Sequence, residues 1–290
     1  MPVPLSRRAR GGYGGVVVHV QRCQRQHVAG AASVSVLGSV SGPPRSVAVL
    51  HAGQDAVYLD LDGACLGVLS SRAVLVPCGV RTHRPRLPAL HPGDGATVGG
   101  GSIELPGLEV TVTQTVDTTV GVLSADDIAS GAHLLRRAVG DRLAGALAEL
   151  PEDPMRRLAA CDPAAVAGLL GFGGGLTPLG DDVLAGWLAA GVATRHPALG
   201  ALRSGVVRSA RQRTTTLSAT LLECAARGEG VPQFGNLLRA MATGDPAPVE
   251  RAVDDLLDIG GTSGSGLVLG ALVSVESRQR LSPSPQGVSR

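Results

Sequence analysis

Residues 124–150 read SADDIASGAHLLRRAVGDRLAGALAEL, and the period of the sequence changes at the start of this stretch. Its apolar side chains recur at intervals of three and four residues, which is the spacing of one face of a helix. These side chains are Ile128, Ala132, Leu135, Val139, Leu143, Ala146 and Leu150. Ser124, followed three residues later by Asp127, is an N-cap signature. The stretch therefore predicts the helix that opens a helical half of the protein.

The sequence before this stretch is typical of β-structure. Residues 16–122 are rich in valine, threonine and short alternating runs, and Gly, Pro and Asp interrupt them repeatedly. The expected strands are 46–50, 56–61, 64–69 and 73–76, with a hairpin over 103–112. Asp62-Gly63 predicts a hairpin turn, because these residues tolerate positive φ. Residues 81–101, which are rich in proline and glycine, predict a long surface connection.

Cap and stop signals predict further helices after residue 150. Asp162-Pro163, Thr177-Pro178 and Asp245-Pro246 each combine a cap with a first-turn proline. Apolar residues within 217–225 predict another helix before Gly228, and residues 267–275 predict a closing buried helix or, as the alternative, a strand. The fold class is α+β, with a β-rich N-terminal domain (sheet or barrel) and a mainly α-helical C-terminal domain with Gly-rich loops at helix N-termini. The expected boundaries are a flexible N-terminus at 1–15, the β-rich domain at 16–123, the helical domain at 124–276 and a disordered tail at 277–290.

Composition describes a folded chain and excludes several classes of function. The 290 residues are 44% hydrophobic and 17% charged. The 26 basic residues are all arginine, and there are only five aromatic residues, so we expect no nucleic-acid partner. The absence of lysine excludes Schiff-base chemistry and the phosphate loop that ends in Gly-Lys-Ser/Thr.

Cysteine and histidine spacing gives no support for a metal site. The five cysteines form no C-x-x-C pair, which suits a reducing compartment and small core residues, and the seven histidines lack metal-ligand spacing. The longest apolar run, 183–193, is too short to cross a bilayer. We therefore expect a cytoplasmic protein with no membrane partner.

The Gly-rich segment 171–182, GFGGGLTPLGDD, is the first candidate site. Glycine lets backbone N–H groups approach an anion, and a following helix adds its own free donors and the positive end of its dipole. A carboxylate or phosphate would bind there through Gly173, Gly175, Thr177 and Gly180. The alternative is a flexible turn between helices.

Asp181 and Asp182 end this segment and are the candidate catalytic acid/base residues. Neighbours on a helix point about 100° apart, so one can hold the loop while the other faces the pocket. A magnesium ion through Asp181 or Asp182 is possible, because hard cations take carboxylate oxygens, and no other cofactor is expected. In the alternative interpretation, the pair only complements the helix dipole.

Two further segments supply hydroxyl and glycine groups. In 211–218, RQRTTTLS, Thr214 and Thr215 each share a helix face with Ser218, and Arg213 lies beside them. The alternative there is a helix N-cap with solvated arginines. In 260–266, GGTSGSG, the candidate binding residues are Thr262, Ser263 and Gly264. Together the three segments indicate several walls of one polar pocket.

At these segments the chain resembles the AllH-like family of oxamate carbamoyltransferase subunits. The matching motifs are GLTPLGDD at 175–182, TTTLS at 214–218 and GGTSG at 260–264, all in the C-terminal half. The resemblance implies a part in an assembly with two other subunit types that phosphorolyses oxalurate to oxamate and carbamoyl phosphate in allantoin breakdown. It also implies a small anionic ligand: oxalurate, oxamate, carbamoyl phosphate or phosphate.

The chain departs from its relatives in the late loop, where Gly261 and Gly266 stand at positions that are often ionisable in them. This departure keeps two alternatives open. One is a non-catalytic carboxylate-binding or scaffold subunit, and the other is a magnesium-dependent hydrolase with a divergent substrate.

Overall fold

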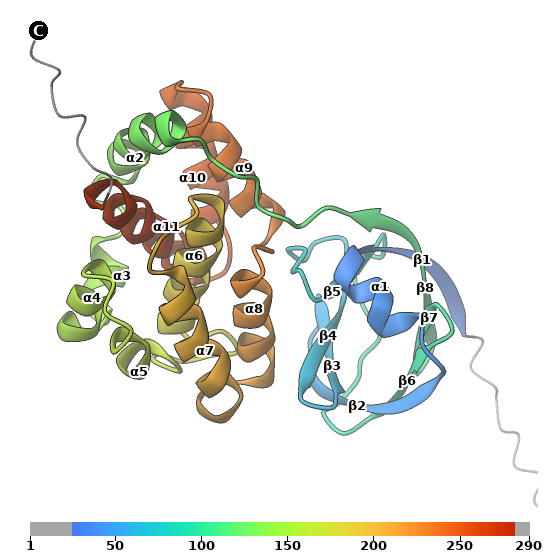
Figure 1. The fold of residues 1–290 in the computed structure, drawn as a ribbon. Coiled ribbons are helices and arrows are strands. Elements are labelled where there is room, and N and C mark those ends of the chain that lie inside the picture. Colours follow the sequence, from blue (N-terminus) through green and yellow to red (C-terminus); the bar gives the residue numbers. More distant parts are fainter. Residues whose placement is uncertain (1–24, 282–290) are drawn as a thin grey trace, which may run out of the picture.

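The computed structural model describes residues 25–281, which form a β-barrel followed by a bundle of helices (Figure 1). An extended segment carries the chain from the last strand to the first helix of the bundle. The expected β-rich half followed by a helical half is confirmed, and the open choice between sheet and barrel is settled as a closed barrel.

The barrel contains eight strands in the order β1-β5-β4-β3-β2-β6-β7-β8, and β8 pairs with β1 to close it. The strands are β1 (Gln26–Ser33), β2 (Arg45–Ala52), β3 (Ala56–Leu61), β4 (Ala64–Leu69), β5 (Gly79–Thr82), β6 (Gly95–Gly99), β7 (Ser102–Leu105) and β8 (Leu108–Val116). The β1–β8 and β4–β5 pairs are parallel, and the other pairs are antiparallel. Alternate side chains, among them Val57 and Leu59, point inward and fill the barrel.

Turn chemistry in the barrel follows the sequence. Asp62 and Gly63 adopt φ of 57° and 85° between β3 and β4, as the hairpin signal predicted, and Gly107 adopts 79° between β7 and β8. A short helix, α1 (Val34–Val40), was not expected, because its alternating Val-Ser-Val sequence is typical of a strand. Ser33 caps it by accepting a hydrogen bond from Val36 N at 3.3 Å.

Two expectations for the barrel region are wrong. Residues 73–76 form no strand, because the chain turns on both sides of them: Ala73 N bonds to Ser70 O and Gly79 N bonds to Val76 O. The expected connection at 81–101 includes the end of β5 and all of β6, since Ala96 and Val98 are buried in the barrel despite the neighbouring glycines. The part of the expected β-rich domain before residue 25 lies outside the described residues.

The helical half contains ten of the described helices. They are α2 (Ala125–Val139), α3 (Ala144–Glu149), α4 (Glu152–Ala159), α5 (Ala165–Leu169), α6 (Leu179–Ala193), α7 (Leu199–Arg213), α8 (Thr216–Ala226), α9 (Pro232–Met241), α10 (Pro246–Leu257) and α11 (Ser263–Arg280). The predicted capping box of α2 is confirmed: Ser124 Oγ accepts from Asp127 N, and Asp127 Oδ2 accepts from Ser124 N. Asp245 caps α10 as expected, and residues 267–275 are helical.

Other helix boundaries differ from the prediction. Pro178 and not Thr177 is the N-cap of α6, and α5 begins two residues after Pro163. The apolar face predicted through Leu150 is divided between α2 and α3, because the chain turns at Gly140. Helix α11 continues to Arg280, past the expected domain end at residue 276.

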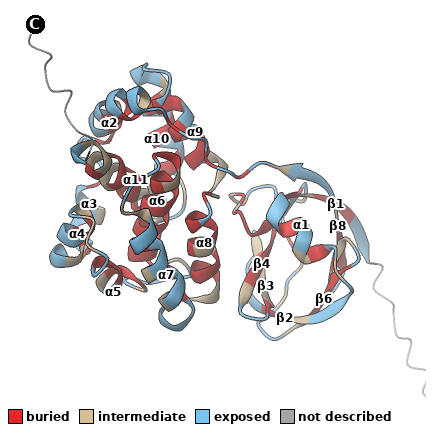
Figure 2. Cartoon of the chain, viewed as in Figure 1, coloured by how far each residue is buried: buried red, intermediate tan, exposed pale blue. Residues whose placement is uncertain are grey.

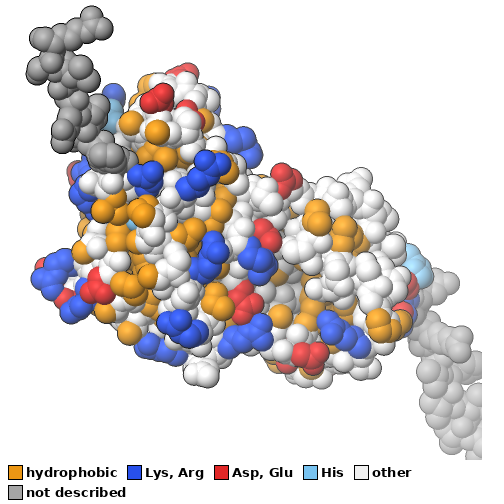
Figure 3. Space-filling model, in the orientation of Figure 1, with side chains coloured by type: hydrophobic (Ala, Val, Ile, Leu, Met, Phe, Trp, Pro, Cys, Tyr) orange, Lys and Arg blue, Asp and Glu red, His pale blue; other side chains and the backbone are white. Residues whose placement is uncertain are grey.

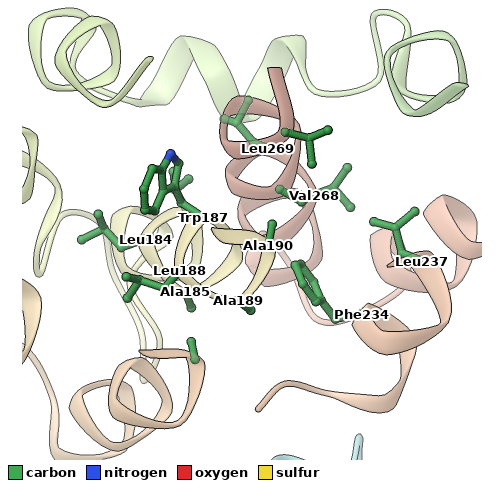
Figure 4. Packing of buried hydrophobic residues seen from close by; sticks show 14 of the residues in the cluster. Leu184, Ala185, Trp187, Leu188, Ala189, Ala190, Phe234, Leu237, Val268 and Leu269 are labelled. Atoms are coloured by element: carbon green, nitrogen blue, oxygen red, sulfur yellow. The ribbon is translucent and has the colours of Figure 1, made fainter. Parts of the chain in front are cut away.

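Helix α6 lies at the centre of the bundle, and every residue in it except Val192 is buried. Figure 4 shows α6 beside α11, with Ala190 facing Val268 and Phe234 of α9 and with Trp187 on the other side of α6. Figure 2 shows buried residues along α6 and α8 and exposed ones on the outer faces of α4 and α7. In the visible face of Figure 3, arginine side chains lie over the helical half with acidic residues between them. No helix among residues 25–281 is long and apolar enough to span a membrane.

Candidate functional site

A cavity of about 260 Å³ lies where the barrel meets the helices. The barrel contributes Tyr58 of β3 and the β4–β5 connection at Val74, Val76 and Pro77. The helices contribute mostly apolar walls: Leu176, Ala185, Leu217, Leu221, Phe234 and Leu267. The cavity is therefore formed mainly by the helical half and is bounded on one side by the barrel.

Asp182 supplies the buried carboxylate of this cavity. The residue is only 6% exposed, and its Oδ2 accepts no hydrogen bond within the described part of the chain. Burial raises the pKa of Asp182 from 3.8 to about 7; the nearby Ser263 and Thr177 hydroxyls lower it, and the Asp181 carboxylate raises it further. Such a group can hold or release a proton near neutral pH.

Two hydroxyl groups accompany Asp182. Thr177 Oγ1 and Ser263 Oγ are 2.9 Å apart, so they are hydrogen bonded, and both residues line the cavity. Thr177 precedes α6 and Ser263 begins α11, so the closely packed pair of helices brings these two motifs together. The sequence-predicted residues Asp182, Thr177 and Ser263 therefore meet in one place.

Asp181 has a different environment and is only 1% exposed. Its Oδ1 accepts from Gly171 N at 2.7 Å, and its Oδ2 accepts from Ser218 Oγ at 2.7 Å and from Thr214 Oγ1. These bonds join the start of the Gly-rich loop to the α7–α8 junction. Asp181, Thr214 and Ser218 therefore hold the loop in place and do not line the cavity.

The Gly-rich loop is also held by Thr215. This residue is the N-cap of α8, accepting from Ser218 N at 3.0 Å, and its hydroxyl donates to Leu176 O at 2.6 Å. Gly173 and Gly175 adopt φ of 110° and 86°, and both are exposed. Within the described chain the backbone N–H groups of residues 173–177 have no hydrogen-bond acceptor, and of these residues Leu176 and Thr177 line the cavity.

Four other predicted residues do not face the cavity. Arg213 is exposed and donates from Nη2 to Ala167 O at 2.7 Å, which agrees with the alternative of an N-cap flanked by exposed arginines. Thr262 is exposed. Gly180 and Gly264 lie against backbone, because an added Cβ would be 2.1 Å from Leu169 O and 1.7 Å from Leu256 O, respectively. Their N–H groups already bond to Phe172 O and Ile259 O.

Close packing between α11 and α6 explains why residue 266 is glycine. An added Cβ would lie 2.7 Å from Asp182 Cβ and 3.2 Å from Leu179 O, so only glycine permits this approach of α11 to α6. The departure at this position therefore lies against Asp182 and Leu179 of α6, although Gly266 itself does not line the cavity.

The sequence did not indicate Tyr58, Phe234 or Glu229 as cavity residues. Burial raises the pKa of Tyr58, and the thiols of Cys78 and Cys65 raise it further. Glu229 is bonded on both oxygens, by Ser35 Oγ at 2.8 Å and Arg227 Nε at 3.1 Å. The only sequence signal for these cavity residues was that aromatic residues are scarce, and scarcity alone does not show where Tyr58 or Phe234 lies in the fold.

The described residues contain no cluster of three or more His, Cys, Asp or Glu placed to hold a metal ion. Four cysteines in this part of the chain are free thiols, at Cys65, Cys78, Cys161 and Cys224; Cys23 lies outside it. Since Asp181 already accepts three hydrogen bonds, Asp182 is the member of the pair with an oxygen left for a cation or a substrate.

Comparison with known proteins agrees with the motif resemblance. No curated protein and no solved structure matches the chain. The helical walls of the cavity, from Leu176 to Leu267, lie within residues 169–275. These same residues, 169–275, match the model of the family described as oxamate carbamoyltransferase subunit AllH.

Proposed function

We propose that the protein is a subunit of an oxamate carbamoyltransferase-type assembly and that its cavity holds the carbamoyl-bearing substrate. The observation that carries the proposal is the coincidence of the family match with the helical walls of the cavity, including Asp182. The reaction would be phosphorolysis of oxalurate to oxamate and carbamoyl phosphate, with the other subunits of the assembly as partners.

Asp182 is the acid/base group in this proposal. A phosphate oxygen attacks the carbamoyl carbon, the bond from that carbon to the oxamate nitrogen breaks, and the leaving nitrogen takes up a proton. A carboxyl group with a pKa of about 7 can deliver this proton near neutral pH. Asp181 contributes by holding the Gly-rich loop, through Gly171 N and the Thr214 and Ser218 hydroxyls.

The anionic part of the substrate belongs at the edge of the cavity. The free N–H groups of residues 173–177 can bind a carboxylate or a phosphate there. Arg213 lies in the next segment but is bonded to Ala167 O. Additional positive charge for phosphate would come from a partner subunit.

A second candidate is a non-catalytic binding or scaffold subunit. It is favoured by the cavity lining, which has no arginine, lysine or histidine among the described residues. Phosphoryl and carbamoyl transfer normally use such cations to stabilise developing negative charge. A magnesium ion at Asp182 is a further proposal, and it predicts that added magnesium raises the melting temperature.

The decisive experiment is reconstitution of the full-length chain with its partner subunits, followed by an assay of carbamoyl phosphate formed from oxalurate and phosphate. We expect Asp182→Asn to lower kcat by about a hundredfold or more, because the variant lacks a proton donor of suitable pKa. Asp255→Asn, on the exposed face of α10, is the matched control and should keep full activity. Full turnover by Asp182→Asn would exclude the acid/base role and leave the scaffold candidate.

A further inference from the structure

The cavity has one polar end and a long apolar wall. Asp182, Thr177 and Ser263 form the polar end. The rest of the interior is dominated by aliphatic and aromatic side chains, among them Leu217, Leu221 and Phe234. A volume of about 260 Å³ is roughly that of nine water molecules at ~30 Å³ each. The space is larger than one polar group requires.

The polar end is rich in acceptors and short of donors. Asp182 Oδ2 is buried without a hydrogen-bond donor among the described residues. The two hydroxyls have one hydrogen each: one is used within the Thr177–Ser263 bond, and the other is available to the Asp182 carboxylate, whose Oδ2 still has no donor. A buried acceptor without a partner costs free energy, so the complementary ligand is one that brings N–H groups.

Charge argues against an anion inside the cavity. Asp182 and Glu229 are the lining carboxylates, and the described lining contains no cation to offset them. Glu229 is paired with Arg227 and accepts a hydrogen bond from Ser35 Oγ, whereas Asp182 has no cationic partner in the described lining. An anion beside Asp182 would meet like charge in an apolar surrounding, where Coulomb repulsion is poorly screened.

An ammonium group also fits poorly. It would lose its hydration against apolar walls, and one carboxylate with few other polar groups in the described lining would not repay that loss. A neutral primary amide or ureido group has N–H donors for Asp182 Oδ2. It loses far less hydration on burial than an ion does.

We propose that the cavity binds an uncharged primary amide or ureido head at Asp182, Thr177 and Ser263, with an apolar body lying along Leu217, Leu221 and Phe234. This inference deepens the proposed function and rests on it in taking the cavity as the substrate site. The ligand would be a carbamoyl compound with a more apolar body than oxalurate, and any anionic group on it would remain at the Gly-rich loop.

Binding to the full-length chain tests the ligand class directly, by calorimetry and thermal shift with four probes of the same size range. Benzamide and phenylurea have the neutral N–H head, benzoate is the anionic analogue, and benzylamine is the cationic analogue. We expect saturable binding of benzamide and phenylurea below ~10 mM, which is a normal range for ligands of this size, and no binding of the two ions. Preferential binding of benzoate or benzylamine, or no binding of either neutral probe, would overturn the inference.

Variants locate the binding. Asp182→Asn replaces the unpartnered acceptor by a group with its own N–H donors, so we expect benzamide affinity to fall about tenfold. Thr177→Val keeps the shape and removes one hydroxyl, and it should also weaken benzamide binding. Asp255→Asn should bind like the unchanged protein. Unaltered benzamide affinity in both cavity variants would show that the probe binds elsewhere and would overturn the inference.

Oxalurate, tested in the same way and in the reconstituted assembly, separates this inference from the proposed function. Turnover of oxalurate without binding of the neutral probes would overturn the ligand class and leave the carbamoyltransferase role intact. Binding of benzamide at Asp182 with no oxalurate turnover would support the ligand class and overturn the carbamoyltransferase role.

Discussion

Asp181 and Asp182 are neighbours in α6, yet their carboxylates lie in opposite environments. Asp181 accepts three hydrogen bonds from the loop and from α8, whereas Asp182 Oδ2 accepts none within the described residues. The rotation of about 100° per residue in a helix explains the difference, because it turns one side chain toward the α7–α8 junction and the next toward the cavity. The same rotation predicted from sequence that the pair would divide its roles, but not which residue would take which role.

Asp182 should make stability depend on pH. Its pKa is raised from 3.8 to about 7 on folding, so between these values the folded state holds a proton that the unfolded state has released. This contribution therefore lowers the free energy of unfolding as pH rises toward 7. The Asp182→Asn variant has no such proton. Its free energy of unfolding, relative to that of the unchanged protein, should therefore be higher near pH 8 than near pH 5, by about 3 kcal/mol. Denaturant unfolding at both pH values measures this difference.

Comparing the variant with the unchanged protein removes other titrating groups from this test. Burial, assisted by Arg278, lowers the pKa of His196 from 6.5 to about 4, which gives the opposite pH slope in both proteins. Asp181, whose charge acts on Asp182, and the cavity residues Glu229 and Tyr58 are also common to both. An advantage that is the same at both pH values would show that Asp182 has an ordinary pKa.

Helices α6 and α11 cross closely, and this contact positions the polar end of the cavity. An added Cβ at Gly186 would lie 2.2 Å from Leu267 O, and one at Gly270 would lie 2.0 Å from Val183 O. Glycine at these two positions lets the backbones touch, which brings Ser263 at the start of α11 to Thr177 before α6. Helix packing thus places two residues that are 86 positions apart in the sequence.

Gly270→Ala should therefore be strongly destabilising. The methyl group would meet a backbone carbonyl, which cannot move away as a flexible side chain can, so the helices must separate and lose core packing. Overpacking of this kind costs about 1–3 kcal/mol or more. Gly200→Ala in α7 is the matched control, because the residue is exposed with nothing within 4 Å of the added Cβ. It should gain up to about 1 kcal/mol from helix propensity.

Thermal unfolding of the two alanine variants measures both effects. The two melting temperatures should move in opposite directions, and a small or favourable change for Gly270→Ala would contradict the close crossing.

Helix caps and apolar spacing in the sequence correctly predicted those helices whose conformation depends on neighbouring residues. Ser124 and Asp245 were identified as caps, and the apolar face of α2 followed from its spacing. Helix α7 was missed because it buries few side chains, at Leu202, Val206 and Ala210, and has no side-chain cap. Helix α1 was missed because its valines alternate as in a strand, and contact with the barrel decides its conformation.

Residues 25–281 form two separate apolar cores with a small third cluster between them. The barrel and the bundle each enclose their own apolar residues. Between them lie Cys65, Cys78, Leu217 and Cys224, with Tyr58, Val76 and Leu221 packed against them. The sequence analysis placed the cysteines in the core correctly for these three buried thiols. It could not predict the cavity, because residues from β3 to α11 surround it and no local sequence pattern indicates that these distant segments are in contact.

A hydrogen bond joins the barrel to the helical bundle at the contact between β4 and α8, which is called the joint below, and a substitution can test its contribution to stability. Cys65 N in β4 donates to Thr220 Oγ1 in α8 at 2.9 Å, and both residues are buried. Thr220→Val keeps the shape of the side chain but leaves the Cys65 N–H without its acceptor, which should cost about 1–3 kcal/mol. We also expect faster amide hydrogen exchange in β4, because the bond that protects this N–H is lost.

Thr111→Val is the control for this substitution, since Thr111 is exposed in β8 and lies away from the joint. The single tryptophan, Trp187 in α6, reports unfolding of the helical half, while circular dichroism follows both halves. In the unchanged protein the two transitions should coincide if the joint couples the cores. In Thr220→Val the two transitions should move apart, because the contact between α8 and β4 is weakened. Unchanged stability and exchange in Thr220→Val would mean that apolar packing alone holds the barrel against the bundle.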